Sequence, residues 1–320
     1  MEAATAPGFF SFLGHGASLP ARNRGLFLPL LAVTAALAAA LLLGNALAVQ
    51  PLAAAVLVDA DAISRADPAS AAYRELARSL RADVRRFLLA AGSCLLAAVL
   101  AGSAIKIATV FAAVAAFSGR AERRATTVAE ALAAARGNVW GPVLTVAFGY
   151  VLELACAGGI VAMALLAVVL LEYSLLLLFL DALLVLLASL FLVYLTVVCA
   201  VAVVVSAAEP GRRGAAAVSR AWRLMRGKNA QAVLYVVATC ALAAAVSPVY
   251  TLALTWWPRS AATGVAAGAA YVLLLGAVEV FSVAAVTAYY FECRECKEEE
   301  EEIMAGHRYT KLPNGDEANI

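Results

Sequence analysis

The sequence predicts an all-α integral membrane protein with six transmembrane helices and with amphipathic helices at the cytoplasmic interface. The first observation behind this prediction is composition: the 320 residues are 64% hydrophobic and 14% charged, against roughly 45–50% apolar and about 25% charged in a soluble domain. The second is that the apolar residues gather in runs that exceed the about 20 residues needed to cross a membrane. The net charge of +2 gives no reason to expect a nucleic-acid partner.

Six runs with no charge or a single charge place the spans. They cover residues 26–49, 87–117, 140–171, 175–205, 230–257 and 263–291. The apolar stretch over residues 139–205 is also long enough for three short helices, because about 20 residues suffice for each. We favour two tilted helices that meet at a hairpin around Glu172, with Glu172 and Asp181 at the water interface. The first run is longer than the apolar region of a signal peptide, so we interpret it as a signal anchor.

The distribution of Lys and Arg predicts that both termini are cytoplasmic. Six spans put both termini on one side of the membrane, and positive charge concentrates in cytoplasmic loops. Sixteen of the 24 basic residues lie on the side of the termini and seven lie on the other side, while Lys106 lies inside a span. The predicted organisation is a cytoplasmic tail over residues 1–25, a six-helix transmembrane domain over 26–291 and a disordered acidic cytoplasmic tail over 292–320. The endomembrane system and the plasma membrane fit this pattern equally.

The loop between the fourth and fifth spans predicts a basic helix at the membrane interface. Val218, Trp222 and Met225 recur at helical spacing along a segment rich in arginine. A helix that carries tryptophan and basic residues next to a span suits the headgroup region of a membrane. We therefore predict anionic lipid headgroups as partners. The predicted contacting residues are Arg213, Arg220, Trp222, Arg223 and Arg226.

The loop between the second and third spans repeats this pattern. Thr127, followed three residues later by Glu130, is a capping-box signature of a helix start. Both loop segments end at a glycine, Gly137 in one and Gly227 in the other, as helices commonly do. We interpret the two regions as an internal duplication of a span, an interfacial helix and a further span.

The second basic segment also resembles a known motif. Its run AVSRAWRLMRGK over residues 217–228, followed by an apolar span, is similar to the membrane domain attached to some glycerophosphodiester phosphodiesterases and to a group of uncharacterised plant multi-pass membrane proteins. The resemblance implies a helical multi-pass domain with this basic helix on the cytoplasmic face. It does not extend to the phosphodiesterase reaction, because no segment has room for a soluble catalytic domain. The matching positions are Ala217, Ser219, Ala221, Trp222, Leu224, Arg226 and Gly227.

No arrangement of residues in the sequence predicts an enzyme. The two histidines, His15 and His307, lie in polar tails without the spacing of metal ligands. No glycine-rich phosphate loop is followed by Lys and Ser or Thr, and no Ser or Cys has a nearby base. We therefore predict a protein without catalytic residues, cofactor or metal.

Three charges inside the predicted spans are candidates for a functional cluster. Lys106, Glu153 and Glu279 lie 12 or 13 residues from the cytoplasmic ends of their spans, which is about 18–20 Å along a helix. Charges at such depth usually face protein or water and mark function. The interpretations are an ion pair that fixes helix packing, which we favour, a site for a polar solute, proton or ion, and a neutral Glu in a water pocket. We predict that Lys106 faces Glu153 or Glu279 and not lipid, with Glu153 the favoured partner.

Two cysteines follow the last span and are candidates for modification. Juxtamembrane cysteines such as Cys293 and Cys296 suit reversible acylation. Unmodified thiols and metal binding are the alternatives, and a CxxC spacing alone is weak evidence for zinc, which takes four ligands. Residues 309–313 near the end of the acidic tail are a candidate docking motif for a protein partner.

These features leave two functional hypotheses. The first is a non-enzymatic membrane organising or regulatory protein that contacts anionic lipid or partners through its cytoplasmic basic helices. The second is a small-solute or ion transporter that uses the intramembrane Lys/Glu cluster. The first is favoured because Ala, Leu and Val dominate the spans and no span shows a polar face that would line a path.

Overall fold

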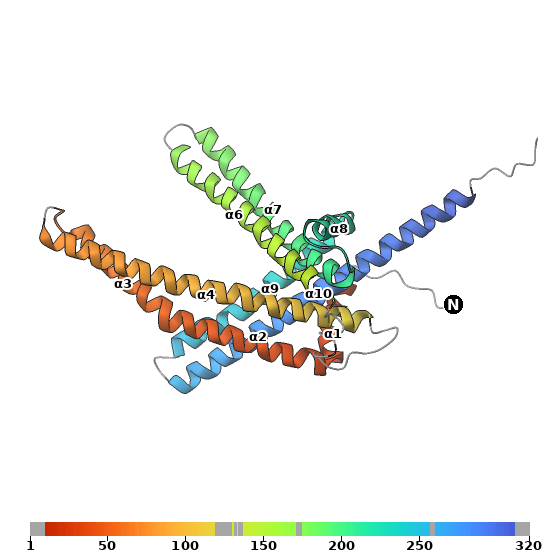
Figure 1. Cartoon of the computed structure of the whole chain (residues 1–320), viewed down its shortest axis with the longest axis horizontal. Coiled ribbons are helices and arrows are strands. Elements are labelled where there is room, and N and C mark those ends of the chain that lie inside the picture. Colours follow the sequence, from red (N-terminus) through yellow and green to blue (C-terminus); the bar gives the residue numbers. More distant parts are fainter. Residues whose placement is uncertain are drawn as a thin grey trace, which may run out of the picture. The chain divides into compact units, whose positions relative to one another are not determined.

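The computed structural model describes residues 10–68, 70–118, 130, 133, 137–170, 175–256 and 260–310. Within these residues the chain forms helices and no strand. Six helical segments are long and apolar enough to cross a membrane, and they coincide with the six predicted spans. The prediction of an all-helical chain with six candidate spans is therefore confirmed (Figure 1).

The first two segments extend well beyond the predicted spans. Helix α2 (Arg24–Gly44), a π-helical turn η1 (Asn45–Val49) and helix α3 (Gln50–Arg65) follow one another, and helix α4 covers Ala71–Ser118. The Oγ of Ser70 accepts a hydrogen bond from the N–H of Tyr73 at 3.1 Å, so Ser70 caps the start of α4. Across the turn, Ser79 Oγ on α4 donates to Asp59 Oδ2 on α3 at 2.8 Å. The loop between the first two spans is therefore largely helical, and its apolar residues from Tyr73 to Phe87 recur at the spacing of one helix face.

Residues 140–208 form a helical hairpin of two helices. Helix α6 (Trp140–Leu170) and helix α7 (Leu175–Ala208) lie side by side (Figure 1). The described residues of this stretch therefore form two long helices rather than three short ones, while Glu172 lies outside the described residues. Asp181 is only 5% exposed, so it is buried against protein, and its position at the water interface stays a prediction. A carboxyl group in an apolar hairpin is more stable against the neighbouring helix than in lipid.

The remaining helices are two short helices outside the predicted spans and two long helices that contain the fifth and sixth spans. Helix α1 (Ser11–Arg22) lies in the expected N-terminal tail, and helix α8 (Ala215–Met225) lies between the fourth and fifth spans. Helix α9 (Asn229–Trp256) contains Pro248 without interruption. Helix α10 covers Ala261–Thr310, so the backbone of the expected acidic tail begins as a continuation of the last span.

The chain divides into two compact units. The first unit contains Met1–Leu26, Thr109–Ala241 and Phe281–Ile320, and the second contains Phe27–Ala108 and Leu242–Val280. The core of the first unit joins buried valines of α7 to aromatic residues of α10; Val204, Tyr289 and Tyr290 are each 0% exposed.

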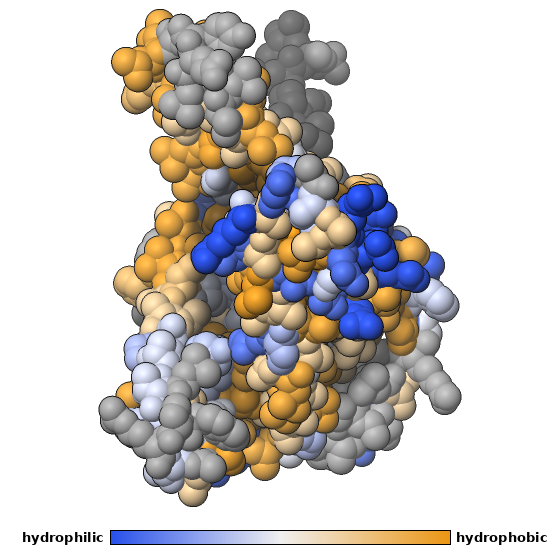
Figure 2. All heavy atoms as spheres, turned by 90° about the vertical axis from the view of Figure 1, so that its left-hand side faces the viewer, coloured by the Kyte–Doolittle hydropathy of each residue, from blue (hydrophilic) through white to orange (hydrophobic). Residues whose placement is uncertain are grey.

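The second unit is held together by helix contacts of small and aromatic residues. Gly276 of α10 lies so close to α2 that a Cβ atom there would be 3.1 Å from Leu31 Cδ1 and 3.5 Å from the Ala35 nitrogen. The rings of Tyr250 on α9 and Tyr271 on α10 have centroids 5.2 Å apart. On the face drawn in Figure 2, hydrophobic side chains cover much of the coloured surface and hydrophilic side chains gather in patches.

Candidate functional site

Helix α8 is placed by a turn that contains two glycines. Gly211 and Gly214 have φ angles of 102° and 52°, a conformation that glycine adopts without steric strain. The N–H of Gly214 donates to Oγ1 of Thr145 on α6 at 3.0 Å and so ties the start of α8 to the hairpin. At the other end, α8 stops before Gly227, whose φ is 98°, and this confirms the predicted glycine at the helix end.

One face of α8 is buried in the core of the first unit. Ala217, Ala221, Leu224 and Met225 are each at most 2% exposed and pack into the same cluster as the valines of α7. Their spacing by three and four residues is that of a single helix face. This face is offset from the stripe that the sequence suggests, because Trp222 is 39% exposed. Alanine side chains let the backbone of α8 approach the core more closely than a tryptophan would.

The outer side of α8 and of its flanking residues is basic. Arg213, Arg223 and Arg226 are exposed. The Trp222 ring sits edge-on to Tyr194 of α7, with centroids 5.2 Å apart. Four of the five residues predicted to contact lipid therefore lie on the surface, and a stacked aromatic pair fixes the orientation of one of them.

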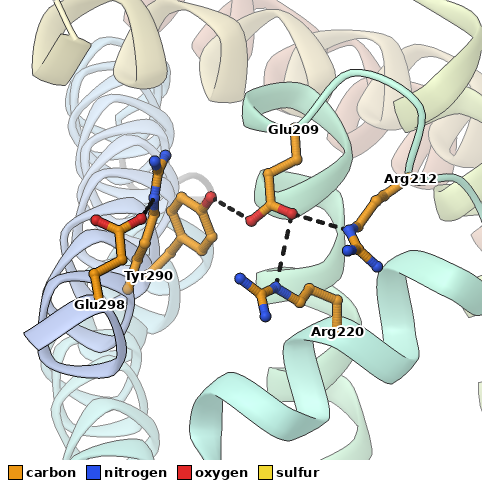
Figure 3. Close-up of polar contacts among 6 residues, drawn as sticks. Glu209, Arg212, Arg220, Tyr290 and Glu298 are labelled. Carbon is orange, nitrogen blue, oxygen red and sulfur yellow. Dashed lines mark hydrogen bonds and ion pairs between the residues drawn. The ribbon is translucent and has the colours of Figure 1, made fainter. Parts of the chain in front are cut away.

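The fifth of these residues, Arg220, belongs to an internal ion network around Glu209. The Glu209 carboxylate is 3.1 Å from Arg212 Nε and 3.7 Å from Arg220 Nε. On its other side it accepts a hydrogen bond from the hydroxyl of Tyr290 at 3.0 Å. Figure 3 shows the carboxylate lying between the two arginines and the tyrosine. We call these four residues the Glu209 clamp.

The Glu209 clamp joins separate elements of the first unit. Glu209 follows the end of α7, Arg220 comes from α8 and Tyr290 comes from α10. Tyr290 is 0% exposed, and a buried tyrosine hydroxyl needs a hydrogen-bond partner. The carboxylate also offsets the charges of two arginines whose side chains are 44% and 29% exposed. The clamp therefore holds α8 in place. The more exposed arginines Arg213, Arg223 and Arg226 are not part of it.

A second polar cluster surrounds Lys228, in the turn between α8 and α9. Its Nζ donates to the backbone oxygen of Glu292 at 3.1 Å and to Cys296 Sγ at 3.0 Å. Its backbone oxygen accepts a hydrogen bond from the hydroxyl of Tyr289 at 3.2 Å. Burial lowers the pKa of Lys228, but the hydrogen bond to Cys296 and the charges of Cys293, Cys296 and Glu292 raise it, and the net pKa is raised. Lys228 therefore carries its charge at neutral pH, at a fixed place beside α10.

Glu292 connects this cluster to helix α1. Its side chain is 7% exposed, its Oε1 accepts a hydrogen bond from Ser11 Oγ at 2.6 Å, and His15 Nδ1 lies 3.8 Å from the same oxygen. In the described part of the chain, Glu292 Oε2 is buried without a hydrogen-bond partner. The carboxyl group is thus anchored to α1 by one oxygen only.

Helix α1 packs against α10 through a glycine. A Cβ atom on Gly16 would lie 2.7 Å from the Cα of Ala285, which is closer than two carbon atoms approach. Phe12 is 0% exposed, and its ring centroid is 5.7 Å from that of Tyr289. The N-terminal segment is therefore part of the packed first unit.

The three charges predicted to lie inside the membrane belong to both units. Lys106 and Glu279 lie in the second unit and Glu153 lies in the first. The side chains of Lys106 and Glu279 are exposed, and that of Glu153 is partly buried. Among the residues that the structure describes, no ion pair links Lys106 to Glu279. The predicted cluster of three charges stays a prediction.

The two tail cysteines have different environments. Cys293 is 1% exposed and belongs to the core, whereas Cys296 is partly buried and contacts Lys228. In the described ranges, no group of three metal-binding side chains could hold a metal ion. Glu130 of the predicted capping box is helical and exposed. Its partner Thr127 and most of the helix predicted after it lie outside the described residues, as do residues 311–313 of the docking motif.

Several residues of this site were not singled out by the sequence. Glu209, Tyr290 and Glu292 acquire their roles from helices that meet only in the folded chain. A local signal did exist for α1, because Phe12, Gly16 and Leu19 recur at the spacing of one helix face. The site as a whole is a charged layer on a packed core that can attract anionic groups at its exposed arginines.

Comparison with known proteins gives one match. A family model described as a domain of unknown function, DUF8558, matches residues 6–307. No curated protein and no solved structure matches the chain.

Proposed function

The chain belongs to the DUF8558 family, and we propose that it is a non-enzymatic multi-pass membrane protein that binds anionic lipid headgroups through the basic surface of α8 and thereby organises or regulates its membrane. The observation that carries this proposal is the docking of α8. Because its apolar face is buried in the first unit, Arg213, Arg223 and Arg226 are held outward beside the ends of α7 and α9.

This docking determines the kind of lipid contact that α8 can make. A free amphipathic helix inserts its apolar face into the bilayer, but the apolar face of α8 is already occupied by the core. The contact with lipid is therefore mainly electrostatic, and Trp222 adds an aromatic ring of the kind that sits at headgroup level. Each basic residue near an anionic surface contributes about 1 kcal/mol.

The proposal predicts that anionic lipid stabilises the protein through these three arginines. The full chain, purified in a neutral detergent, should show a higher Tm with phosphatidylserine than with phosphatidylcholine. Replacing Arg213, Arg223 and Arg226 with Gln should remove most of that difference. Raising the salt concentration should reduce it in the unmodified protein, because the Debye length is only about 10 Å at 0.1 M salt.

The matched control replaces three exposed arginines of α4 with Gln: Arg74, Arg78 and Arg81. This control variant should keep the full response to phosphatidylserine. Equal stabilisation by the two lipids, or equal losses in the two triple variants, would contradict the proposal.

The proposal places both termini and α8 on the cytoplasmic side. The bias of sixteen basic residues against seven supports this orientation. A glycosylation acceptor inserted at the turn after Arg65 should be modified in eukaryotic microsomes, whereas one placed beside Asn319 should not. Modification at Asn319 alone would reverse the topology and put the arginines of α8 on the side of the membrane poorer in anionic lipid.

A further inference from the structure

Cys293 and Cys296 lie one helical turn apart on α10, but only one of them is accessible. Cys293 is 1% exposed in the core of the first unit. Cys296 is partly buried and stands outside that core. A reagent in solution can therefore reach the Cys296 thiol more easily than the Cys293 thiol on the same helix.

A fixed ammonium group accompanies the accessible thiol. Lys228 Nζ is 3.0 Å from Cys296 Sγ and 3.1 Å from the backbone oxygen of Glu292. The main chain of Lys228 is also held, because its oxygen accepts the hydrogen bond from Tyr289. The contact is thus built by three residues of α10 around one lysine, which places a positive charge beside the Cys296 sulfur.

A further polar atom in this cluster lacks a partner. Glu292 is 93% buried, since its exposed fraction is 7%, and its Oε2 has no hydrogen-bond partner within the described residues. Lys228 Nζ contacts the backbone oxygen of this same residue. The cluster therefore places a lysine ammonium beside the Cys296 sulfur, next to a residue whose buried carboxyl group is only partly paired.

We propose that Cys296 is a site of S-acylation by a long-chain acyl thioester and that Cys293 is not. The position suits a lipid chain, because Cys296 lies five residues beyond the predicted end of the last span, about 7.5 Å along the helix. An acyl chain attached there reaches back into the same bilayer. It would add a second membrane contact to the basic surface of α8, so the inference rests on the proposed function for the side of the membrane that it assumes.

The chemical step is an acyl transfer between sulfur atoms. The Cys296 thiolate attacks the carbonyl carbon of an acyl-coenzyme A, a new S–C bond forms, and the C–S bond to coenzyme A breaks. Coenzyme A leaves as a thiolate and takes up one proton, so the proton lost by the Cys296 thiol is balanced by the proton gained by coenzyme A. The sulfur of the product thioester is a poor hydrogen-bond acceptor, so the Lys228 ammonium becomes available to a lipid phosphate.

The test uses the purified full chain in detergent micelles with palmitoyl-coenzyme A. Peptide mass spectrometry should find one palmitoyl adduct, on Cys296, that hydroxylamine removes. The C293S variant should acquire the adduct at the rate of the unmodified protein, and C296S should acquire none there. Cys240, which is exposed on α9, should react more slowly than Cys296.

The contribution of Lys228 is tested separately. K228M should slow acylation of Cys296 several-fold, whereas K228R should retain most of the rate because it keeps a positive donor. A melting curve for each variant shows whether it is folded. Acylation of Cys293 in place of Cys296, no adduct on Cys296, or an unchanged rate in folded K228M would overturn the proposal.

The acylation proposal and the proposed function fail in different experiments. C296S should keep its stabilisation by phosphatidylserine if the arginines of α8 bind lipid. If Cys296 is not acylated but phosphatidylserine still stabilises the protein, the proposed function stands and the acylation proposal fails. If Cys296 is acylated but phosphatidylserine does not stabilise the protein, the acylation proposal stands and the proposed function fails.

Discussion

In the described residues of the second unit, ion pairs form within single helices, whereas the first unit has both a pair of that kind, Arg294 with Glu298, and a network that links separate elements. In the second unit, Arg65 pairs with Asp61 at 2.8 Å and Arg86 pairs with Asp83 at 3.2 Å, each within one helix, and the arginines are 77% and 72% exposed. In the first unit, the Glu209 side chain is 20% exposed and its contacts come from three elements of the chain. Pairs within a helix in water contribute little to stability, whereas a partly buried network that links helices resists their separation.

The glycines of α1 give the same contrast at a smaller scale. A Cβ atom on Gly14 would meet nothing within 4 Å, whereas one on Gly16 would lie 2.7 Å from the Ala285 backbone. Gly14 is thus an exposed position, whereas Gly16, two residues further along the same helix, is a packing contact. What distinguishes them is the tertiary partner, and the following substitutions test this distinction.

The largest effect is expected for Gly16→Leu. The new side chain would collide with the Ala285 backbone, which cannot move aside as a flexible side chain can, and would push α1 off α10. Exposing Phe12 and straining the contact should together lower the free energy of unfolding by about 3 kcal/mol. Denaturant titration in mixed micelles measures the change. Gly14→Leu is the control and should leave stability equal or slightly higher, because glycine is a poor helix former; similar losses at both positions would show that α1 is not docked through Gly16.

A smaller loss is expected for Glu209→Ala. It removes the partner of the buried Tyr290 hydroxyl and leaves Arg220 without its carboxylate, which should cost about 2 kcal/mol. A double-mutant cycle with Tyr290→Phe isolates the shared hydrogen bond, whose coupling energy should be about 1 kcal/mol. If the losses of stability in the cycle are additive, Tyr290 does not interact with Glu209 and is not part of the Glu209 clamp.

The smallest effect is expected for Asp61→Asn in the second unit. This substitution breaks an ion pair of shorter distance than either pair in the clamp, yet both side chains are largely exposed. The free energy of unfolding should therefore change by less than about 0.5 kcal/mol. A loss as large as that of Glu209→Ala would mean that distance alone decides the strength of these pairs, and the contrast between the units would not hold.

The sequence by itself determined the fold class and the number of candidate spans. Runs of more than about 20 apolar residues leave few alternatives to membrane-crossing helices, because only helices and closed barrels satisfy the backbone in lipid. Two local features could also be predicted from the sequence: the helical spacing of apolar residues in the loop between the first two spans and the end of α8 at Gly227. Both depend only on residues close together in the chain.

Only the tertiary structure decided which polar residues form the site. Arg220 and Arg223 look alike in the sequence, but one faces Glu209 and the other faces outward, because the alanines of α8 rather than Trp222 pack on the core. Cys293 and Cys296 differ for the same reason. Hydrophobic spacing indicates that a helix has a buried face, but the choice of partner depends on contacts between residues as far apart as Ser11 and Glu292, and no local pattern encodes those.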